Sequence, residues 1–333
     1  MTLGILTSFD DSYKQYITSC EDLGIDYEVI DFKSDYWLKD LKKGNYDGLL
    51  VRPPSQTQEF NTIYMERLYF IHSILGIPMY PSYDSLFLYE NKRVAGDWLE
   101  HFGFPHLKTH VFQTKEDATD FISRNEFPLV FKTNIGSSAT GVDIVKNKSE
   151  ALTLINRAFG RFSPFYKYKF RPSRLKIKLP GTPISQRNFV IIQQYVDIKW
   201  EWRLIKIGNS FFGRRKLLKN GFASGSKLTG WGKPPDELLF MIREISEKQG
   251  FRNISIDFFE TTDDNFLVNE VHALFGTTPE ITRDESELYI DGKPGRLVFK
   301  EGKFIFEEGF FNQNLSYLLR VEDFVKQLSE KNE

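Results

Sequence analysis

The sequence has little cysteine and no long apolar run. A single cysteine, Cys20, stands among 333 residues, so an internal disulfide is excluded and a reducing compartment is favoured. The longest apolar runs, such as 190–192, have the length of a strand, far below the ~20 residues that span a bilayer. The first residues also lack the basic and long apolar segments of a signal peptide. We therefore expect a cytoplasmic protein without a membrane partner.

The chain also lacks an excess of charge of either sign. It has 45 acidic and 44 basic residues, so its net charge says nothing about its partners. Aromatic residues make up 15% of the chain, which excludes intrinsic disorder, because so much apolar surface can offset the loss of chain entropy. A prior of about 150 residues per domain gives roughly two or three domains. The aromatic excess could also serve a surface between two copies, so a homodimer is one expected arrangement.

Two common nucleotide-binding motifs are absent. No G-x-x-x-x-G-K-[ST] occurs, which argues against a P-loop nucleotidase. No G-x-G-x-x-G follows a predicted strand, which argues against a dinucleotide-binding Rossmann domain. Any phosphate-binding loop in this chain has to be of another kind.

Strand-like and helix-like segments alternate over the first 85 residues. This alternation predicts a parallel α/β domain, with strands near 3–6, 27–30, 46–52 and 77–80 and helices near 12–23 and 60–75. The rest of the chain predicts a mixed arrangement, with helices near 90–102, 151–159, 234–250 and 315–329 and strand-rich segments near 128–146, 189–218, 254–273 and 288–307. The fold class expected from this pattern is α/β, or α+β for the chain as a whole.

The first candidate for chemistry is a loop of small residues after a lysine. A predicted strand ends at Lys132, residues 134–141 follow, and a second strand begins at Val142. Gly136 and Gly141 allow the backbone to approach a ligand, and successive N–H groups can point at phosphate oxygens. The alternative interpretation is an ordinary hairpin.

The second candidate is a pair of acids in a predicted hairpin. If 262–265 is the turn, Asp257 faces Glu270 on the same side of the sheet, and His272 lies opposite Ser255. Opposed like charges destabilise a sheet unless a cation lies between them. Mg²⁺ accepts such oxygen ligands and takes the rest from nucleotide phosphates. The alternative is a solvated acidic face with a lysine nearby.

The third candidate is an asymmetry of charge. Residues 151–196 contain no acid and nine basic residues, among them Lys169 and Arg171, which alternate with aromatic residues. A strand with one basic face favours an anionic substrate or a nucleic acid, and the alternative is a solvated face balanced by acids elsewhere. No RNA- or DNA-binding motif accompanies these residues, so we do not expect a nucleic-acid partner.

These pieces, in this order, resemble the ATP-grasp superfamily over about residues 80–282. The course of that family corresponds here to Lys92, Lys132 with its loop, the segment 193–196, Glu201 with Arg203, the basic residues 214–216 before 223–226, and finally Asp257 with Glu270. The resemblance implies an N-terminal α/β domain at 1–88, a central subdomain at 89–194 that carries the glycine-rich loop, and a C-terminal subdomain at 195–333.

The resemblance also implies roles for individual residues. ATP phosphates would be held by Lys92, Lys132, Gly136, Ser137 and Ser138, adenine by Gln193, Gln194, Tyr195 and Val196, and ribose by Glu201. Charge on the transferred phosphoryl group would be stabilised by Arg203 and Arg215, and Mg²⁺, with Mn²⁺ as an alternative, would be bound by Asp257, Glu270 and His272. An anionic substrate would be held by Arg52, Lys169, Arg171, Ser224 and Gly225.

Two residues depart from the pattern of the family. The third metal ligand is usually Asn, and here it is His272, which suits Mg²⁺ less well; the alternatives are that His272 binds phosphate or substrate, or that a second metal is bound weakly. The adenine hinge, residues 193–196, has Gln194 where an acid is common, so its contact with adenine stays open. The leading hypothesis is an ATP-dependent ligase that activates a carboxylate and joins it to an amine, the carboxylate being a small molecule, a peptide or a glycan. The second is an ATP-grasp kinase acting on a hydroxyl, and the third is an ATP-binding regulator without turnover.

Overall fold

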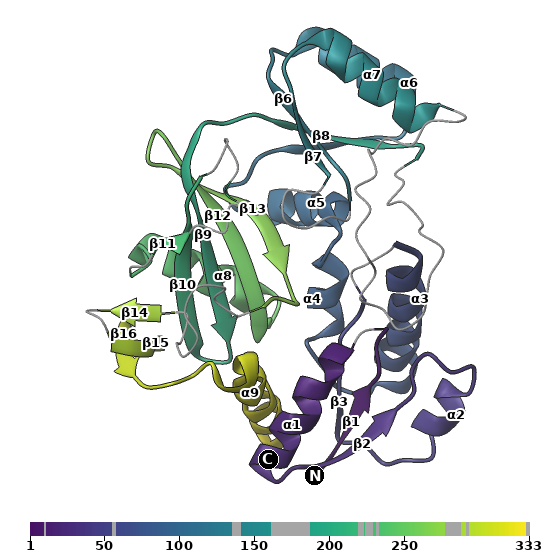
Figure 1. The fold of residues 1–333 in the computed structure, drawn as a ribbon, viewed down its shortest axis with the longest axis vertical. Helices are drawn as coiled ribbons and strands as arrows, with labels where there is room; N and C mark the ends of the chain where they lie inside the picture. The colour runs from purple at the N-terminus through teal and green to yellow at the C-terminus, as the bar shows by residue number, and fades with distance from the viewer. Residues whose placement is uncertain are drawn as a thin grey trace.

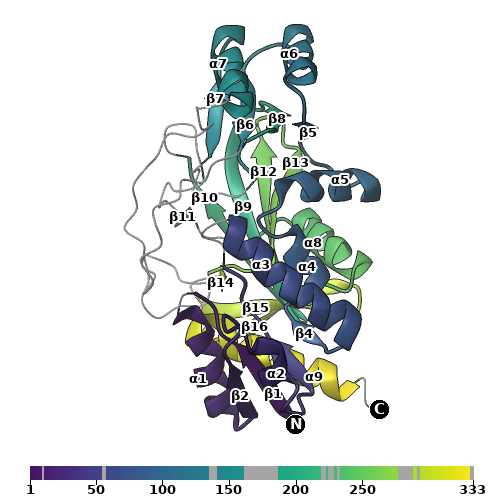
Figure 2. The ribbon, with the colours of Figure 1, turned by 90° about the vertical axis from the view of Figure 1, so that its right-hand side faces the viewer.

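The described residues form three sheets, which Figure 1 shows in different parts of the molecule. The N-terminal sheet lies at the bottom, a small sheet at the top, and a large sheet beside them (Figures 1 and 2). The computed structural model describes residues 1–9, 11–54, 58–134, 141–160, 187–218, 223, 229–230, 233–276, 288–290 and 293–330.

The N-terminal sheet is parallel, as the alternating pattern predicts. Its strand order is β2-β1-β3-β4, and the pairing of β1 with both neighbours and of β3 with β4 is parallel. The buried apolar residues of β1 and β3 form its centre. The elements are β1 (Thr2–Leu6), a 3₁₀ turn (Asp11–Tyr13), α1 (Lys14–Leu23), β2 (Asp26–Ile30), α2 (Trp37–Leu41), β3 (Gly48–Leu50), α3 (Gln58–Tyr69), a π-helix (Phe70–Leu75), β4 (Met79–Tyr80) and α4 (Tyr83–Leu88).

The small sheet has the order β5-β8-β6-β7 and carries helices α6 and α7 on one face. Both helices begin at capping residues, because Thr114 accepts from the N–H of Asp117 and Asn147 accepts from that of Glu150. The elements are α5 (Lys92–Phe102), β5 (Thr109–Phe112), α6 (Lys115–Arg124), β6 (Leu129–Lys132), β7 (Val142–Val145), α7 (Lys148–Phe159) and β8 (Val190–Gln194). The two predicted strands around Lys132 are thus β6 and β7, and residues 135–140 of the predicted loop lie outside the described residues.

The large sheet is antiparallel and presents one face to the small sheet. Its order is β13-β12-β9-β10-β15-β14, with β11 paired to β10 and β16 to β15. Helix α8 packs its apolar side on the opposite face, against residues such as Leu204 and Ile256. The elements are β9 (Ile198–Ile207), β10 (Ser210–Lys216), β11 (Thr229–Gly230), α8 (Asp236–Lys248), β12 (Asn253–Thr261), β13 (Phe266–His272), β14 (Leu288–Ile290), β15 (Lys293–Lys300) and β16 (Lys303–Glu308).

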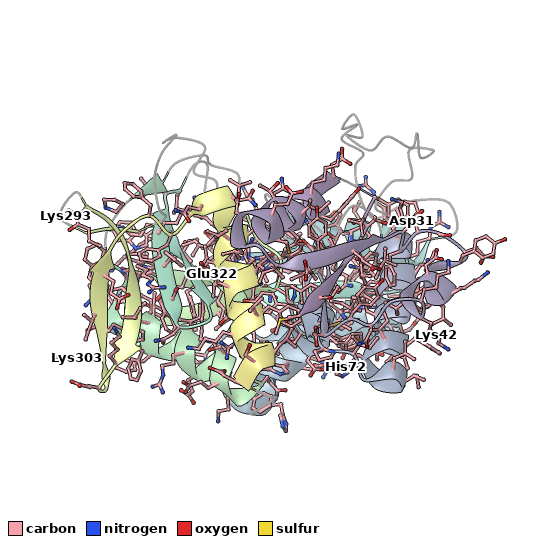
Figure 3. The ribbon with its side chains drawn as sticks, turned by 90° about the horizontal axis from the view of Figure 1, so that it is seen from below. Asp31, Lys42, His72, Lys293, Lys303 and Glu322 are labelled. Carbon is pink, nitrogen blue, oxygen red and sulfur yellow. The ribbon has the colours of Figure 1, made fainter. Side chains whose placement is uncertain are left out.

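Helix α9 (Tyr317–Glu330), which follows a 3₁₀ turn (Gln313–Ser316), packs on the N-terminal sheet rather than on the sheet that precedes it in sequence. Val321 and Phe324 share a core with Leu3 and Ile5 of β1. Seen from below, α9, marked by Glu322, lies between the hairpin of Lys293 and Lys303 and the N-terminal elements that carry Asp31 and His72 (Figure 3).

The helices in the described ranges are short or amphipathic. None of them is both long enough and apolar enough to cross a membrane. The longest, α9, has 14 residues, and charged side chains interrupt its apolar ones.

Candidate active site

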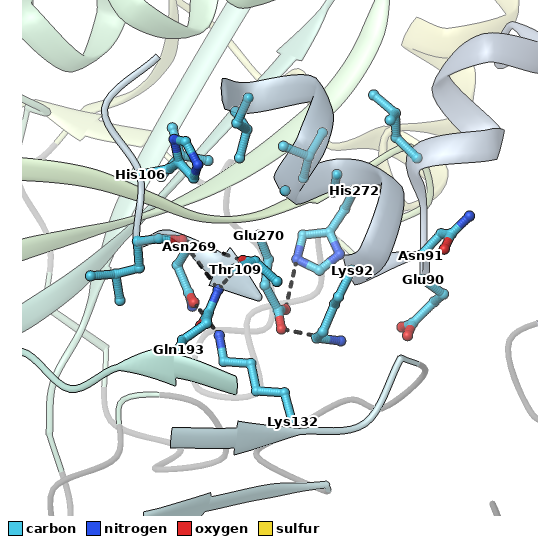
Figure 4. Close-up of a pocket in the computed structure, with 17 residues that line it drawn as sticks. Glu90, Asn91, Lys92, His106, Thr109, Lys132, Gln193, Asn269, Glu270 and His272 are labelled. Atoms are coloured by element: carbon cyan, nitrogen blue, oxygen red, sulfur yellow. Dashed lines mark hydrogen bonds and ion pairs between the residues drawn. The ribbon is translucent and has the colours of Figure 1, made fainter. Parts of the chain in front are cut away.

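The candidate site lies between the small sheet and the facing side of the large sheet. Among the described residues, side chains from α5, β5, β6, β8 and β13 line a pocket there (Figure 4). Lys132 reaches into it from β6, Gln193 from β8 and Lys92 from the first turn of α5. Segments that are far apart in the sequence therefore meet at one place.

The two acids face each other, as the sequence predicts, but the hairpin that carries them is less regular. Asp257 pairs with Glu270, and Ser255 pairs with His272. The predicted even ladder up to a turn at 262–265 is wrong, because the register shifts by one residue beyond Asp257. Asn269 is the extra residue of a β-bulge, which compensates for the longer turn and keeps the acids opposed.

Two cations surround Asp257. Arg203 donates to its two carboxylate oxygens over 2.7 and 2.8 Å, and Lys216 donates to Oδ2 over 2.7 Å and also to Glu201. Asp257 and Glu201 are both buried. Burial alone would raise the pKa of Asp257, but Arg203 and Lys216 hold it well below its usual range. Burial raises the pKa of Glu201 to about 7 against the opposing charge of Lys216.

Arg215 lies on the other face of the sheet from this cluster, which argues against its predicted role at the transferred phosphoryl group. Across β9 and β10, Lys216 pairs with Glu201 whereas Arg215 pairs with Trp202. Because side chains alternate between the faces of a sheet, Arg215 lies on the face opposite the acids. Its guanidinium carbon is 4.6 Å from the ring centroid of Trp200 and 5.3 Å from that of Trp202. Lys216 is the residue of this strand that the structure places beside Asp257.

Lys132 is buried at the end of β6 and continues a chain of hydrogen bonds. Its Nζ donates to Oδ1 of Asn269 over 3.0 Å, and Nδ2 of Asn269 donates to Oε2 of Glu201 over 3.1 Å. Burial lowers the pKa of Lys132 to about 8, although the nearby Glu270 carboxylate opposes this change. An anionic ligand would favour the charged form of this lysine.

Lys92, Glu270 and His272 form the remainder of the cluster. Nζ of Lys92 lies 3.4 Å from Oε1 of Glu270, and Nε2 of His272 lies 3.3 Å from Oε2 of the same carboxylate (Figure 4). Burial alone would raise the pKa of Glu270, but Lys92 and His272 hold it well below its usual range. Burial alone would lower the pKa of His272, yet the carboxylates of Asp257 and Glu270 raise it.

Three of these side chains are suitable ligands for a divalent ion. Asp257, Glu270 and His272 each offer one ligand atom, and these atoms lie within 4.8 Å of one another. Two carboxylates and an imidazole are donors that divalent cations accept. The residues present therefore fit a divalent metal ion.

Gln193 is the member of the predicted hinge that lines the pocket. Its Nε2 donates to Oγ1 of Thr109 over 2.6 Å and to the carbonyl oxygen of Leu107 over 3.4 Å. Because a carbonyl oxygen only accepts, this contact fixes the orientation of the amide. The Oε1 atom is buried and makes no hydrogen bond within the described residues. It is thus available to accept from a ligand, such as the amino group of a base.

The other hinge residues are not part of this pocket's lining. Gln194 is exposed, Val196 is partly buried, and the hydroxyl of Tyr195 donates to Asp197 over 3.0 Å. Their predicted contact with adenine runs chiefly through backbone groups and stays a prediction.

Several predicted residues lie outside the described part of the chain, namely Gly136, Ser137, Ser138, Lys169, Arg171, Ser224 and Gly225. Arg52 is described and follows β3 at the carboxyl edge of the parallel sheet. It donates to the hydroxyl of Ser12, and its guanidinium lies 5.9 Å from the ring of Tyr317. It does not line the pocket of Figure 4, and its role in substrate binding stays a prediction.

Three residues at the site were not assigned from the sequence: Lys216, Asn269 and Thr109. Asn269 accepts from Lys132 and donates to Glu201. No sequence pattern predicts this role, because the position of Asn269 depends on the bulge. Thr109 became relevant only when β5 was found beside β8. The sequence could have indicated Lys216, because it lies two residues from Arg214 and therefore shares a strand face with this arginine.

Comparisons with known proteins give related folds. No protein-family model matches the chain. The chain is 23% identical over 269 residues to glutamate–LysW ligase of Sulfolobus acidocaldarius, covering 78% of this chain and 83% of that protein. D-alanine–D-alanine ligase from Bacillus anthracis matches with a TM-score of 0.56 and 16% identity over 99% of each chain. A RimK-domain ATP-grasp protein from Sphaerobacter thermophilus matches with a TM-score of 0.53 and 14% identity, covering 81% of this chain and 90% of that one.

Proposed function

We propose that this chain, which has the ATP-grasp fold, is an ATP- and metal-dependent ligase that joins a substrate carboxylate to an amine. The convergence of Lys92 and Lys132 with the ligand set of Asp257, Glu270 and His272 carries this proposal. The names of the curated relative and of D-alanine–D-alanine ligase describe ligases, which supports the same class of reaction. Mg²⁺ is the ion that the fold leads us to expect.

In the proposed reaction, a carboxylate oxygen of the substrate attacks the γ-phosphorus of ATP, and ADP leaves with the electron pair of the broken P–O bond. The amine then attacks the acyl carbon, phosphate leaves, and the nitrogen loses a proton. A bound divalent ion would neutralise phosphate charge during the first step. The chain offers cations and metal ligands at this site, and positioning with charge neutralisation is what phosphoryl transfer mainly requires.

The nucleotide would be held from both sheets. Lys132 and Lys92 would pair with phosphate oxygens, and both now lie near carboxylates that phosphate would replace as partners. The buried Oε1 of Gln193 would accept from the adenine amino group, and Glu201 would accept from ribose. Arg203 and Lys216 would stabilise charge on the transferred group, because both reach Asp257 from the same face.

The substrate is proposed to be anionic, as the basic residues of the sequence indicate. Arg52 is placed at the carboxyl edge of a parallel sheet, where α/β folds commonly bind ligands. The single cysteine and the use of ATP are consistent with a cytoplasmic enzyme. A homodimer also stays a proposal.

The reaction is tested by a screen of paired carboxylates and amines with ATP, in which ADP and phosphate are both measured. Glutamate and D-alanine, each with amino acids and short peptides as the amine, are the first pairs to try. A carboxylate labelled with ¹⁸O should pass one labelled oxygen to the released phosphate. ADP formed with a phosphorylated hydroxyl and no free phosphate would instead identify a kinase, and ATP binding without any turnover a regulator.

Neighbouring basic residues on β10 provide a matched test of the phosphoryl site. We expect Lys216→Met to lower kcat by about 10²-fold, the usual effect of removing one donor from developing charge. Arg215→Met should change kcat by less than about threefold and cost about 1 kcal/mol of stability, since its cation–π contacts face away from the site. The measurements are steady-state ADP release and thermal unfolding. Equal losses of kcat in the two variants would refute the assignment of Lys216.

A further inference from the structure

The imidazole of His272 is the third member of the candidate metal-ligand set, beside Asp257 and Glu270. Nε2 of His272 lies 3.3 Å from Oε2 of Glu270 and 3.5 Å from Oδ2 of Asp257. Adjacent ligands around an ion with bonds of about 2.2 Å are roughly 3.1 Å apart when they meet at right angles. The two distances from the imidazole nitrogen are therefore close to those between adjacent ligands on one ion, and all three ligand atoms lie within 4.8 Å of one another.

The imidazole nitrogen Nε2 faces the carboxylates of Asp257 and Glu270 at ion-pair distances. Nε2 is buried and has no hydrogen-bond partner within the described residues, although two carboxylate oxygens lie nearby. The ring is held on β13 by the pairing of His272 with Ser255, and its other side lies against Tyr89, with ring centroids 6.1 Å apart. A buried polar atom without a partner costs free energy unless a ligand satisfies it.

We propose that His272 is a nitrogen ligand that makes this site prefer Mn²⁺ to Mg²⁺. The inference rests on the proposed ATP-dependent function, because it concerns the ion that the same site would take. Mg²⁺ binds almost entirely through oxygen, whereas imidazole is a good ligand for first-row transition ions. Mn²⁺ accepts both oxygen and nitrogen donors. The two carboxylates and the nucleotide phosphates would supply most of its ligands as oxygen atoms, and His272 would supply one nitrogen.

Other elements at the site agree with a single shared ion. Glu270 has its second oxygen 3.4 Å from Lys92, so the Oε2 atom is the one that faces the imidazole. Oδ2 of Asp257 accepts from Lys216 and Arg203 in the absence of an ion. Phosphate oxygens would draw these two cations away, so the ion is expected to bind with nucleotide rather than alone.

The test measures Mn²⁺ binding to the full chain in the presence of ADP, by electron paramagnetic resonance. The parent protein should show a ¹⁴N hyperfine coupling to the bound Mn²⁺, which His272→Asn should remove. The same variant should weaken Mn²⁺ binding about tenfold and change Mg²⁺ binding by less than about threefold, as measured by calorimetry. His110→Asn, on β5 among Phe112 and Phe121, is the matched control and should leave both unchanged.

Each outcome bears on the proposal separately from the ligase function. Bound Mn²⁺ without a nitrogen coupling would overturn the role of His272, and so would equal affinities of the parent protein for Mn²⁺ and Mg²⁺. Neither result would affect the ligase function, which is judged by the release of ADP and phosphate. An imidazole that contacts phosphate instead would give no coupling and a weaker ADP affinity in His272→Asn. A nitrogen coupling in a chain that fails the ligase screen would retain the metal site and overturn the proposed reaction alone.

Discussion

Glu270→Gln is expected to reduce ATP turnover by at least roughly a thousandfold, because a metal ion at a transferring phosphate contributes several kcal/mol to the rate. Glu270 is the better of the two acids to change. It is partly exposed, with 20% of its side chain accessible, whereas only 1% of the side chain of Asp257 is accessible. Asp257→Asn should abolish turnover as well, but it would also leave Arg203 without its buried carboxylate partner and Lys216 with Glu201 alone, and so destabilise the fold. Initial rates of ADP release against metal concentration give the measurement.

Glu260→Gln is the control for the change at Glu270. Glu260 lies on β12 near Asp257 but on the opposite face, where its carboxylate accepts from the indoles of Trp200 and Trp202. A glutamine oxygen can still accept from both. We expect its rate and metal response to equal those of the parent. If Glu270→Gln showed the same metal response as the parent too, the pair of acids would not be a metal site.

Lys132→Met is expected to weaken ATP binding by about 100-fold, since a charge-assisted bond from a buried ammonium to phosphate is worth roughly 2–3 kcal/mol. The fold should tolerate the change, because methionine fills the same buried volume at the end of β6. Asn269 would lose one donor, and it keeps its bond to Glu201. Calorimetric titration with a non-hydrolysable ATP analogue measures the affinity directly.

A second, partly buried lysine provides the control for this experiment. Lys206 is on β9 of the large sheet, its pKa is likewise lowered to about 8 by burial, and it donates to the carbonyl oxygen of Phe251. Lys206→Met should leave ATP affinity unchanged. Because phosphate favours the charged form of Lys132, ATP binding near pH 8 to 9 should take up protons and weaken as pH rises. That proton uptake should persist in Lys206→Met and disappear in Lys132→Met; its persistence in both would exclude Lys132 as the phosphate ligand.

Local patterns predicted most of this fold, and some of the site. The parallel N-terminal sheet followed from alternation. The opposed acids were predicted from a turn one residue shorter than the one observed, and they face each other because the bulge restores the register. The bulge at Asn269 could not be predicted, because it depends on how β13 packs against the rest of the site. The sheet face on which Arg215 lies could have been predicted from the hairpin of β9 and β10. Gly208 and residue 209 form the two-residue connection of this hairpin, which pairs Lys216 with Glu201 and so places Arg215 on the opposite face.

Residues that meet only in three dimensions had no pattern of their own. Gln193 was expected at the hinge, but its partner Thr109 lies 84 positions away on β5. The antiparallel pairing of β5 with β8 places them together, and nothing near either residue encodes it. Such contacts depend on the order of strands in a sheet, which periodicity does not determine.

The packing of α9 on the N-terminal sheet has a consequence for how the chain is made. Leu3, Ile5 and Leu50 leave the ribosome early, yet Val321 and Phe324, which cover them, are translated only after the strands of the large sheet. The nascent α/β domain therefore exposes an apolar face until α9 has been synthesised. The hydroxyl of Tyr80 likewise lacks Asp323, to which it donates over 3.0 Å in the complete fold. Ribosome-bound chains halted before residue 317 should accordingly be cut more readily by proteases than chains in which this helix has emerged and docked.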